Sequence, residues 1–118
     1  MPKTLTLFLT TPPFGFENTL TVLRLADAAL AKGYNVNLFA SADAVYAFER
    51  DQKAIGVPDP VKGFGDLIAR GLHVEVCGSC LALRGIGRDA VLEGSDPSSM
   101  KRLFSLMRAS DVFITLGA

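Results

Sequence analysis

Residues 74–85 read Val-Glu-Val-Cys-Gly-Ser-Cys-Leu-Ala-Leu-Arg-Gly, an apolar strand pattern that passes directly into the start of a helix. The strand pattern covers Val74 to Val76, and both cysteines of the chain, Cys77 and Cys80, fall at the junction. Strands that alternate with helices are typical of α/β proteins, in which helices connect parallel strands. The junction therefore predicts the third strand of an α/β sheet, with two thiols at its carboxyl end.

The same alternation extends outward from this junction. Short apolar runs predict further strands at residues 5–9, 36–40 and 112–116. Apolar residues recur at helical spacing over residues 22–30, 64–68 and 100–107, and Gly33 and Gly71 are placed to end the first two helices. Near-continuous apolar strands separated by helices indicate a doubly wound, mainly parallel sheet with helices on both faces. We expect one α/β domain that spans residues 1–118.

Three local patterns refine this prediction. Ser41 is placed to cap a short helix that carries Val45 and Phe48, and Gly56, Pro58 and Pro60 end regular structure soon afterwards. Asp96-Pro97 predicts the cap and first turn of the last helix. The methionine and aromatic stripe of residues 100–107 is typical of a helix face in the core.

Composition narrows the class of function. The 118 residues carry 12 acidic and 12 basic side chains, so no general attraction to nucleic acid or to an anionic membrane is expected. No apolar run reaches the roughly 18 residues of a membrane span, and the amino terminus shows no secretory leader, so we expect a cytoplasmic protein. Thiols in that compartment stay reduced unless they do redox chemistry. The hydrophobic fraction of 49% favours additional apolar burial between subunits.

Chemistry in a parallel sheet gathers outside the carboxyl ends of the strands. Three loops meet this condition, at residues 10–17, 40–43 and 77–80. If the first and third strands are neighbours, the loop Thr11-Pro12-Pro13-Phe14-Gly15 forms a wall beside the cysteines, with Thr11 and Phe14 bordering the pocket.

The cysteine pair allows several kinds of chemistry. Backbone N–H groups at a helix start lower the pKa of a cysteine, although a free cysteine is also a common buried residue. A dinucleotide site requires a glycine-rich loop after the first strand, where this chain has two prolines and one glycine. Zinc requires three or four ligands, and the single histidine, His73, lies about 13 Å from the strand end at 3.3 Å per residue. Dithiol redox chemistry therefore stays open, and we expect neither a metal nor another cofactor.

Three parts of the chain resemble a known protein family. The opening strand with its Thr-Pro-Pro-Phe-Gly loop, the segment Val-Glu-Val-Cys-Gly-Ser-Cys-Leu-Ala-Leu-Arg-Gly-Ile and the closing helix and strand resemble the DsrE/DsrF-like family of small sulfur-relay proteins, TusD included. The resemblance implies a flavodoxin-like fold, trimers or hexamers, and a persulfide on the cysteine that ends the third strand, which is Cys77. It leaves open whether Cys80 resolves that persulfide or only packs.

Three hypotheses follow from the residues and the resemblance. The first is a sulfur carrier or sulfurtransferase in which Cys77 takes sulfur from a donor protein and passes it to an acceptor thiol. The amides of Gly78 and Ser79 would stabilise the anions, and Arg84 would tune the thiolate. The second is a dithiol redox protein, and the third is a non-catalytic subunit of a sulfur-relay assembly.

Overall fold

The computed structural model describes residues 2–14 and 17–117. Its strands are β1 (Thr4–Leu9), β2 (Asn35–Ala40), β3 (His73–Cys77), β4 (Ser95–Ser98) and β5 (Val112–Leu116). Its α-helices are α1 (Asn18–Ala31), α2 (Pro60–Ala69), α3 (Gly78–Leu83) and α4 (Met100–Ala109). Two 3₁₀ segments complete the fold, η1 (Ala42–Phe48) and η2 (Arg88–Ala90).

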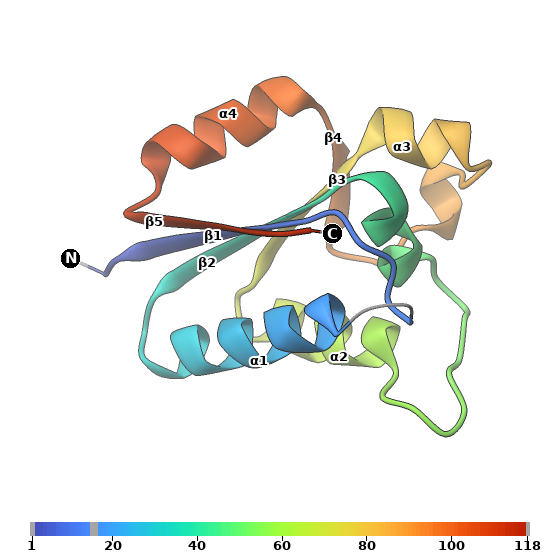
Figure 1. Ribbon diagram of the computed structural model, residues 1–118, viewed down its shortest axis with the longest axis horizontal. Helices are drawn as coiled ribbons and strands as arrows, with labels where there is room; N and C mark the ends of the chain where they lie inside the picture. Colours follow the sequence, from blue (N-terminus) through green and yellow to red (C-terminus); the bar gives the residue numbers. More distant parts are fainter. Residues whose placement is uncertain (1, 15–16, 118) are drawn as a thin grey trace.

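The five strands form one sheet in the order β4-β3-β2-β1-β5, and every pairing is parallel. Figure 1 shows α1 and α2 on one face of the sheet and α4 across the other. Right-handed crossovers that stay on one face carry the chain in one direction, so β1, β2 and β3 are neighbours in sequence order. Helix α4 then returns the chain over the opposite face to β5. The predicted α/β class and parallel sheet are confirmed.

This strand order changes what lies beside the cysteines. The first and third strands are not neighbours, because β2 pairs with both of them. The loop after β1 is expected beside the cysteines only if β1 and β3 are neighbours, so it does not lie there. The loop that follows β2 takes that place.

The apolar patterns produce the elements largely as expected. Alternate residues of the strands, such as Leu7, Leu38 and Val74, are fully buried against α1 and α2. Gly33 and Gly71 end the first two helices in the left-handed region, at φ +83° and +110°, which glycine adopts without strain. Helix α2 begins at Pro60, a residue predicted to end regular structure, because the Asp59 carboxylate accepts a hydrogen bond of 3.1 Å from the Val61 amide.

The expectation for Asp96 and Pro97 is wrong. Both residues lie in the edge strand β4, where Pro97 is in register with Val76, and α4 begins at Met100. A proline, which lacks an N–H donor, is compatible with an edge strand because one side of that strand has no partner. The sequence Asp-Pro is therefore compatible both with the start of a helix and with an edge strand.

Helix α4 also buries less than its sequence predicts. Leu103 and Leu106 face the sheet, whereas Met100, Phe104 and Met107 are 45%, 60% and 40% exposed. The methionine and aromatic stripe thus lies on the outer side of α4, and only two leucines anchor the helix by apolar contact. No helix in the described part of the chain is both long and apolar enough to cross a membrane.

Candidate functional site

The two cysteines lie at the carboxyl end of β3, in different surroundings. Cys77 is the last residue of β3 and is only 5% exposed, because it clusters with Phe39 of β2 and with Leu103 and Leu106 of α4. Cys80 lies in α3 and is partly exposed. Both are free thiols. The pair is therefore unequal, with a buried first cysteine and a partly exposed second one.

The polar contacts of Cys80 come from the loop after β2. The backbone N–H of Ala42 donates to Cys80 Sγ at 3.2 Å, and the Ser41 hydroxyl oxygen lies 3.5 Å from the same sulfur. Ser41 occupies the predicted cap position of η1, but its side chain makes no cap hydrogen bond. Ala42 has a φ of +52°, an uncommon conformation for a residue with a side chain. The strained residue, Ala42, is thus the one whose N–H group points at the sulfur of Cys80.

These contacts favour the thiolate form of Cys80. Burial alone would raise the pKa of its thiol, but hydrogen bonds with Ser41, Ala42 and Cys77 and the charge of Arg84 together lower it. A lowered pKa increases the fraction of thiolate, which is the nucleophilic form. Cys80 thus combines accessibility with stabilised negative charge.

Arg84 lies near Cys80, one helical turn further along. Its guanidinium donates to the Asp43 carboxylate at 2.8 and 3.0 Å and to the Cys80 carbonyl oxygen at 3.1 Å, and it lies 5.9 Å from the ring centroid of Tyr46. These contacts fix the cation between η1 and α3. The bond to Asp43 raises the pKa of Arg84, so the group stays charged.

Gly78 and Ser79 lie between the cysteines but make none of these contacts. A side chain at Gly78 would approach the Ser98 carbonyl oxygen of β4 to 3.2 Å, so the absence of a side chain allows β3 and β4 to pack closely there. Ser79 is exposed to solvent. The donors expected from these two residues are supplied instead by Ser41 and Ala42.

Thr11 and Phe14 lie on the far side of β2. Thr11 Oγ1 accepts a hydrogen bond of 3.0 Å from Asn18 at the start of α1. Phe14 is 57% exposed and lines an apolar hollow with Leu20 and Val57. Gly15 of the predicted loop lies outside the described residues. The structure therefore brings together Cys77, Cys80 and Arg84, but not Thr11 or Phe14.

Sequence reasoning missed Ser41, Ala42 and Asp43 as site residues. The sequence predicts three loops at the carboxyl edge, of which residues 40–43 form one, but only the strand order shows that this loop borders the cysteines. Among residues 2–14 and 17–117, no three metal-binding side chains are grouped so as to hold an ion. His73 instead contacts Glu75 at 2.7 Å.

Comparisons with known proteins agree with this architecture. The family model of the DsrE/DsrF-like family matches residues 3–116. The chain is 32% identical over 110 residues to the uncharacterized protein MJ0989 of Methanocaldococcus jannaschii, covering 93% of this chain and 96% of that one. It is 30% identical over 107 residues to the uncharacterized protein MK0008 of Methanopyrus kandleri, covering 91% and 88%. The crystal structure of the ychN protein from E. coli superimposes with a TM-score of 0.89 at 26% identity, covering 98% of this chain and all of that one.

Proposed function

The chain belongs to the DsrE/DsrF-like family, whose members are generally sulfur-relay proteins, and we propose that it is a sulfurtransferase that carries sulfane sulfur as a cysteine persulfide. The observation that carries the proposal is the environment of Cys80, an accessible thiol whose sulfur lies 3.2 Å from the Ala42 amide nitrogen. The lowered pKa of this thiol supports a nucleophilic role.

The transfer needs only thiol chemistry. The Cys80 thiolate attacks the outer sulfur of a donor persulfide, the donor's sulfur–sulfur bond breaks, and the donor leaves as a thiolate. Cys80 then bears the extra sulfur as a persulfide anion. An acceptor thiolate attacks that outer sulfur, a new persulfide forms on the acceptor, and the Cys80 thiolate returns. The Ser41 hydroxyl, the Ala42 amide and the Arg84 charge favour the anionic Cys80 that begins and ends this cycle.

We assign the cysteine roles in the reverse of the order expected from the sequence, which made Cys77 the sulfur-bearing residue. The exposure of Cys80 and its polar contacts support it as the carrier. The position of Cys77, shielded in a cluster against which Cys80 packs, supports it as the resolving thiol. Attack of Cys77 on the inner sulfur of a Cys80 persulfide would form a disulfide and release hydrosulfide.

Intact-mass measurement after incubation with cysteine persulfide tests the proposal. The wild-type protein is expected to gain about 32 Da, the mass of one sulfur atom. Cys80→Ser should abolish this gain, whereas Cys77→Ser should keep it and accumulate more of the adduct. Ser79→Ala, an exposed position between the two cysteines, is the matched control. A wild-type protein that takes up no sulfur contradicts the proposal, and loss of the adduct only in Cys77→Ser returns the carrier role to Cys77.

Dithiol redox chemistry is the second candidate. It is favoured by the placement of the two cysteines, which lie three residues apart across the start of α3 and belong to one side-chain cluster. This function requires a disulfide that forms and breaks reversibly between Cys77 and Cys80. Titration in buffers of defined thiol–disulfide ratio measures its potential, and absence of the disulfide over the whole range excludes this candidate.

The proposed carrier works within an assembly. Sulfur donor and acceptor proteins are its expected partners, and we propose a homo-oligomer, a trimer or a hexamer. The exposed apolar side chains of α4, Met100, Phe104 and Met107, support burial between subunits because monomers rarely expose large contiguous apolar patches.

A further inference from the structure

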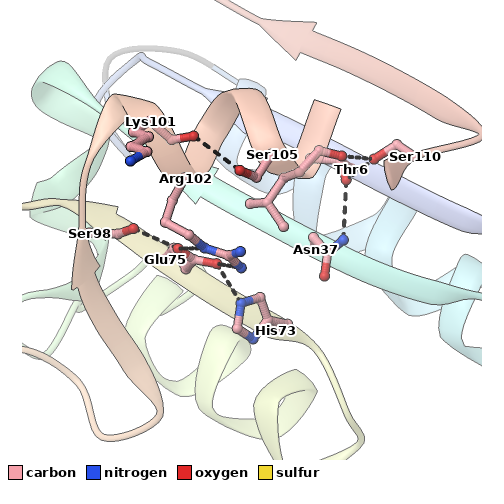
Figure 2. A network of polar contacts seen from close by, with 10 residues as sticks. Thr6, Asn37, His73, Glu75, Ser98, Lys101, Arg102, Ser105 and Ser110 are labelled. Atoms are coloured by element: carbon pink, nitrogen blue, oxygen red, sulfur yellow. Dashed lines mark hydrogen bonds and ion pairs between the residues drawn. The ribbon is translucent and has the colours of Figure 1, made fainter. Parts of the chain in front are cut away.

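A buried carboxylate lies two residues before Cys77. Glu75 is 4% exposed, and β3 alternation places it on the same face of the sheet as Cys77, below α4. Figure 2 shows the Glu75 carboxylate surrounded by Arg102, Ser98 and His73, which come from three different elements. None of the steps proposed for sulfur transfer uses this group.

The carboxylate has charged and polar hydrogen-bond partners. Arg102 of α4 donates through Nε to Oε1 at 3.1 Å and through Nη2 to Oε2 at 2.7 Å. Ser98 of β4 donates to Oε1 at 2.6 Å, and His73 Nε2 lies 2.7 Å from Oε2. A two-pronged arginine–carboxylate pair fixes geometry as well as charge. We call Glu75 and Arg102, with Ser98, the clamp.

The clamp connects helix α4 with the end of β4, an edge strand that pairs along its four residues with β3. Helix α4 buries only Leu103 and Leu106, while its other large apolar side chains are exposed. Strand β4 is a four-residue edge strand that contains Pro97. A single carboxylate on β3 thus binds side chains from both α4 and the end of β4.

The same part of α4 covers Cys77. Leu103 directly follows Arg102, and Leu106 lies one turn later; both cluster with the Cys77 side chain. Ser98 is in register with Cys77, and its carbonyl oxygen lies close to Gly78. The residues that bind Glu75 are therefore next to those that enclose the Cys77 thiol.

A contribution to stability does not by itself explain why a buried ion pair such as Glu75 and Arg102 is present. Replacing a buried ion pair by well-packed apolar residues is often neutral or stabilising, and the best attested use of buried polar groups is to specify one arrangement among several. In this protein, the pair of Glu75 and Arg102 would specify the position of α4 on the sheet.

We propose that Glu75 and Arg102 are positioning residues that hold α4 as a cover over Cys77, so that outside reagents reach Cys80 first. The consequence for sulfur transfer rests on the function proposed above: a shielded Cys77 exchanges sulfur only with Cys80 and not with external donors. The cover itself does not depend on that function.

Alkylation by iodoacetamide, with each cysteine followed separately by peptide mass spectrometry, tests the cover without any sulfur transfer. Arg102→Met should raise the Cys77 alkylation rate about tenfold or more, with Arg102→Lys between it and wild type because lysine lacks the planar fork. Glu75→Gln should act in the same direction as Arg102→Met. The rate at Cys80 and its pH midpoint should stay within about twofold of wild type in every variant.

Two controls distinguish local exposure of Cys77 under α4 from a lower stability of the whole protein. Arg108→Met removes an exposed arginine from the same helix and should leave Cys77 protected. Val22→Ala weakens the core under the opposite face of the sheet, and it should not raise the Cys77 rate selectively. A Cys77 rate that is unchanged in Arg102→Met and Arg102→Lys, or that rises equally in Val22→Ala, overturns the proposal. Alkylation needs no persulfide. The Cys77 alkylation rates therefore test the cover even if the protein does not carry sulfur.

Discussion

The polar contacts of Cys80 come from residues that are distant in sequence. Ser41 and Ala42, at the end of β2, contact its sulfur, and Arg84 is held nearby by Asp43. Hydrogen bonds to a thiolate and a nearby positive charge both stabilise the charged form. At the residue scale, the site therefore consists of one sulfur atom with two polar contacts from the loop after β2 and a cation at the end of α3.

Removal of a donor should raise the Cys80 pKa. Ser41→Ala deletes the hydroxyl that lies 3.5 Å from the sulfur, so the thiolate fraction at neutral pH falls. We expect alkylation of Cys80 at pH 7 to slow by roughly two- to fivefold, with the difference disappearing at high pH where both proteins are ionised. The pH profile of the alkylation rate measures this, and Ser79→Ala is the control. Equal profiles for Ser41→Ala and wild type would contradict the assigned role of Ser41.

The charge of Arg84 should act in the same direction. Arg84→Met removes a cation that lowers the pKa of Cys80, so Cys80 should titrate at higher pH. The effect should be largest at low ionic strength, because salt screens a charge at a partly exposed site. Titration of the ultraviolet thiolate absorbance in a Cys77→Ser background isolates the Cys80 signal. A shift that does not depend on salt would point to lost packing and not to lost charge.

At the element scale, the junction of β3 with β4 depends on close packing at Gly78. An alanine Cβ there would meet the Ser98 carbonyl oxygen at 3.2 Å, so β4 must move by a few tenths of an ångström. We expect Gly78→Ala to lower the free energy of unfolding by about 1 kcal/mol and to speed amide exchange in β4.

Gly65 provides the matched control for that substitution. It lies within α2, and nothing is within 4 Å of an added Cβ. Gly65→Ala should therefore raise the free energy of unfolding by roughly 0.5–1 kcal/mol, because alanine is the better helix former. Urea unfolding measures the free energy of unfolding of both variants. If both substitutions change it in the same direction, packing against Ser98 does not determine the result for Gly78→Ala.

At the scale of the whole molecule, the buried Glu75 carboxylate links folding to pH. Burial would raise its pKa, but hydrogen bonds with Arg102, Ser98 and His73 lower it from 4.5 to about 2. A carboxyl group with a lowered pKa stabilises the folded state fully above its unfolded pKa, and this contribution is lost as pH falls from about 4.5 through 2.

The contribution can be measured as the pH dependence of unfolding. A shift of this size corresponds to up to about 3 kcal/mol above pH 5. Glu75→Gln should therefore show a smaller loss of stability between pH 5 and pH 2 in urea unfolding, whatever its stability at neutral pH. An identical loss in wild type and Glu75→Gln would assign the acid sensitivity to other carboxylates.

The exposed side of α4 determines the expected assembly. Phe104 is 60% exposed at the centre of the patch between Met100 and Met107. If this patch is buried between subunits, Phe104→Glu should reduce the molar mass measured by light scattering, whereas Lys101→Glu, a charge change on the same helix, should have a smaller effect. A wild-type protein that is monomeric at all concentrations contradicts the proposed oligomer.

The sequence by itself determined the elements and their class. Strand and helix periodicities depend on residues a few positions apart, so β1, β2, β3, β5 and α1 could be predicted within a few residues. The same holds for the placement of Cys77 and Cys80 at the end of a strand. The prediction failed at Asp96 and Pro97, because a proline suits both a helix start and an edge strand.

Only the tertiary structure decided which residues meet. The strand order placed Ser41 and Ala42 beside Cys80, separated Thr11 and Phe14 from it, and put Glu75 below α4. These contacts join residues that are tens of positions apart, and local patterns do not encode the order in which strands pair. The sequence therefore located two thiols at a sheet edge. The packing of the loop after β2 and of α4 gave Cys80 its polar contacts and shielded Cys77.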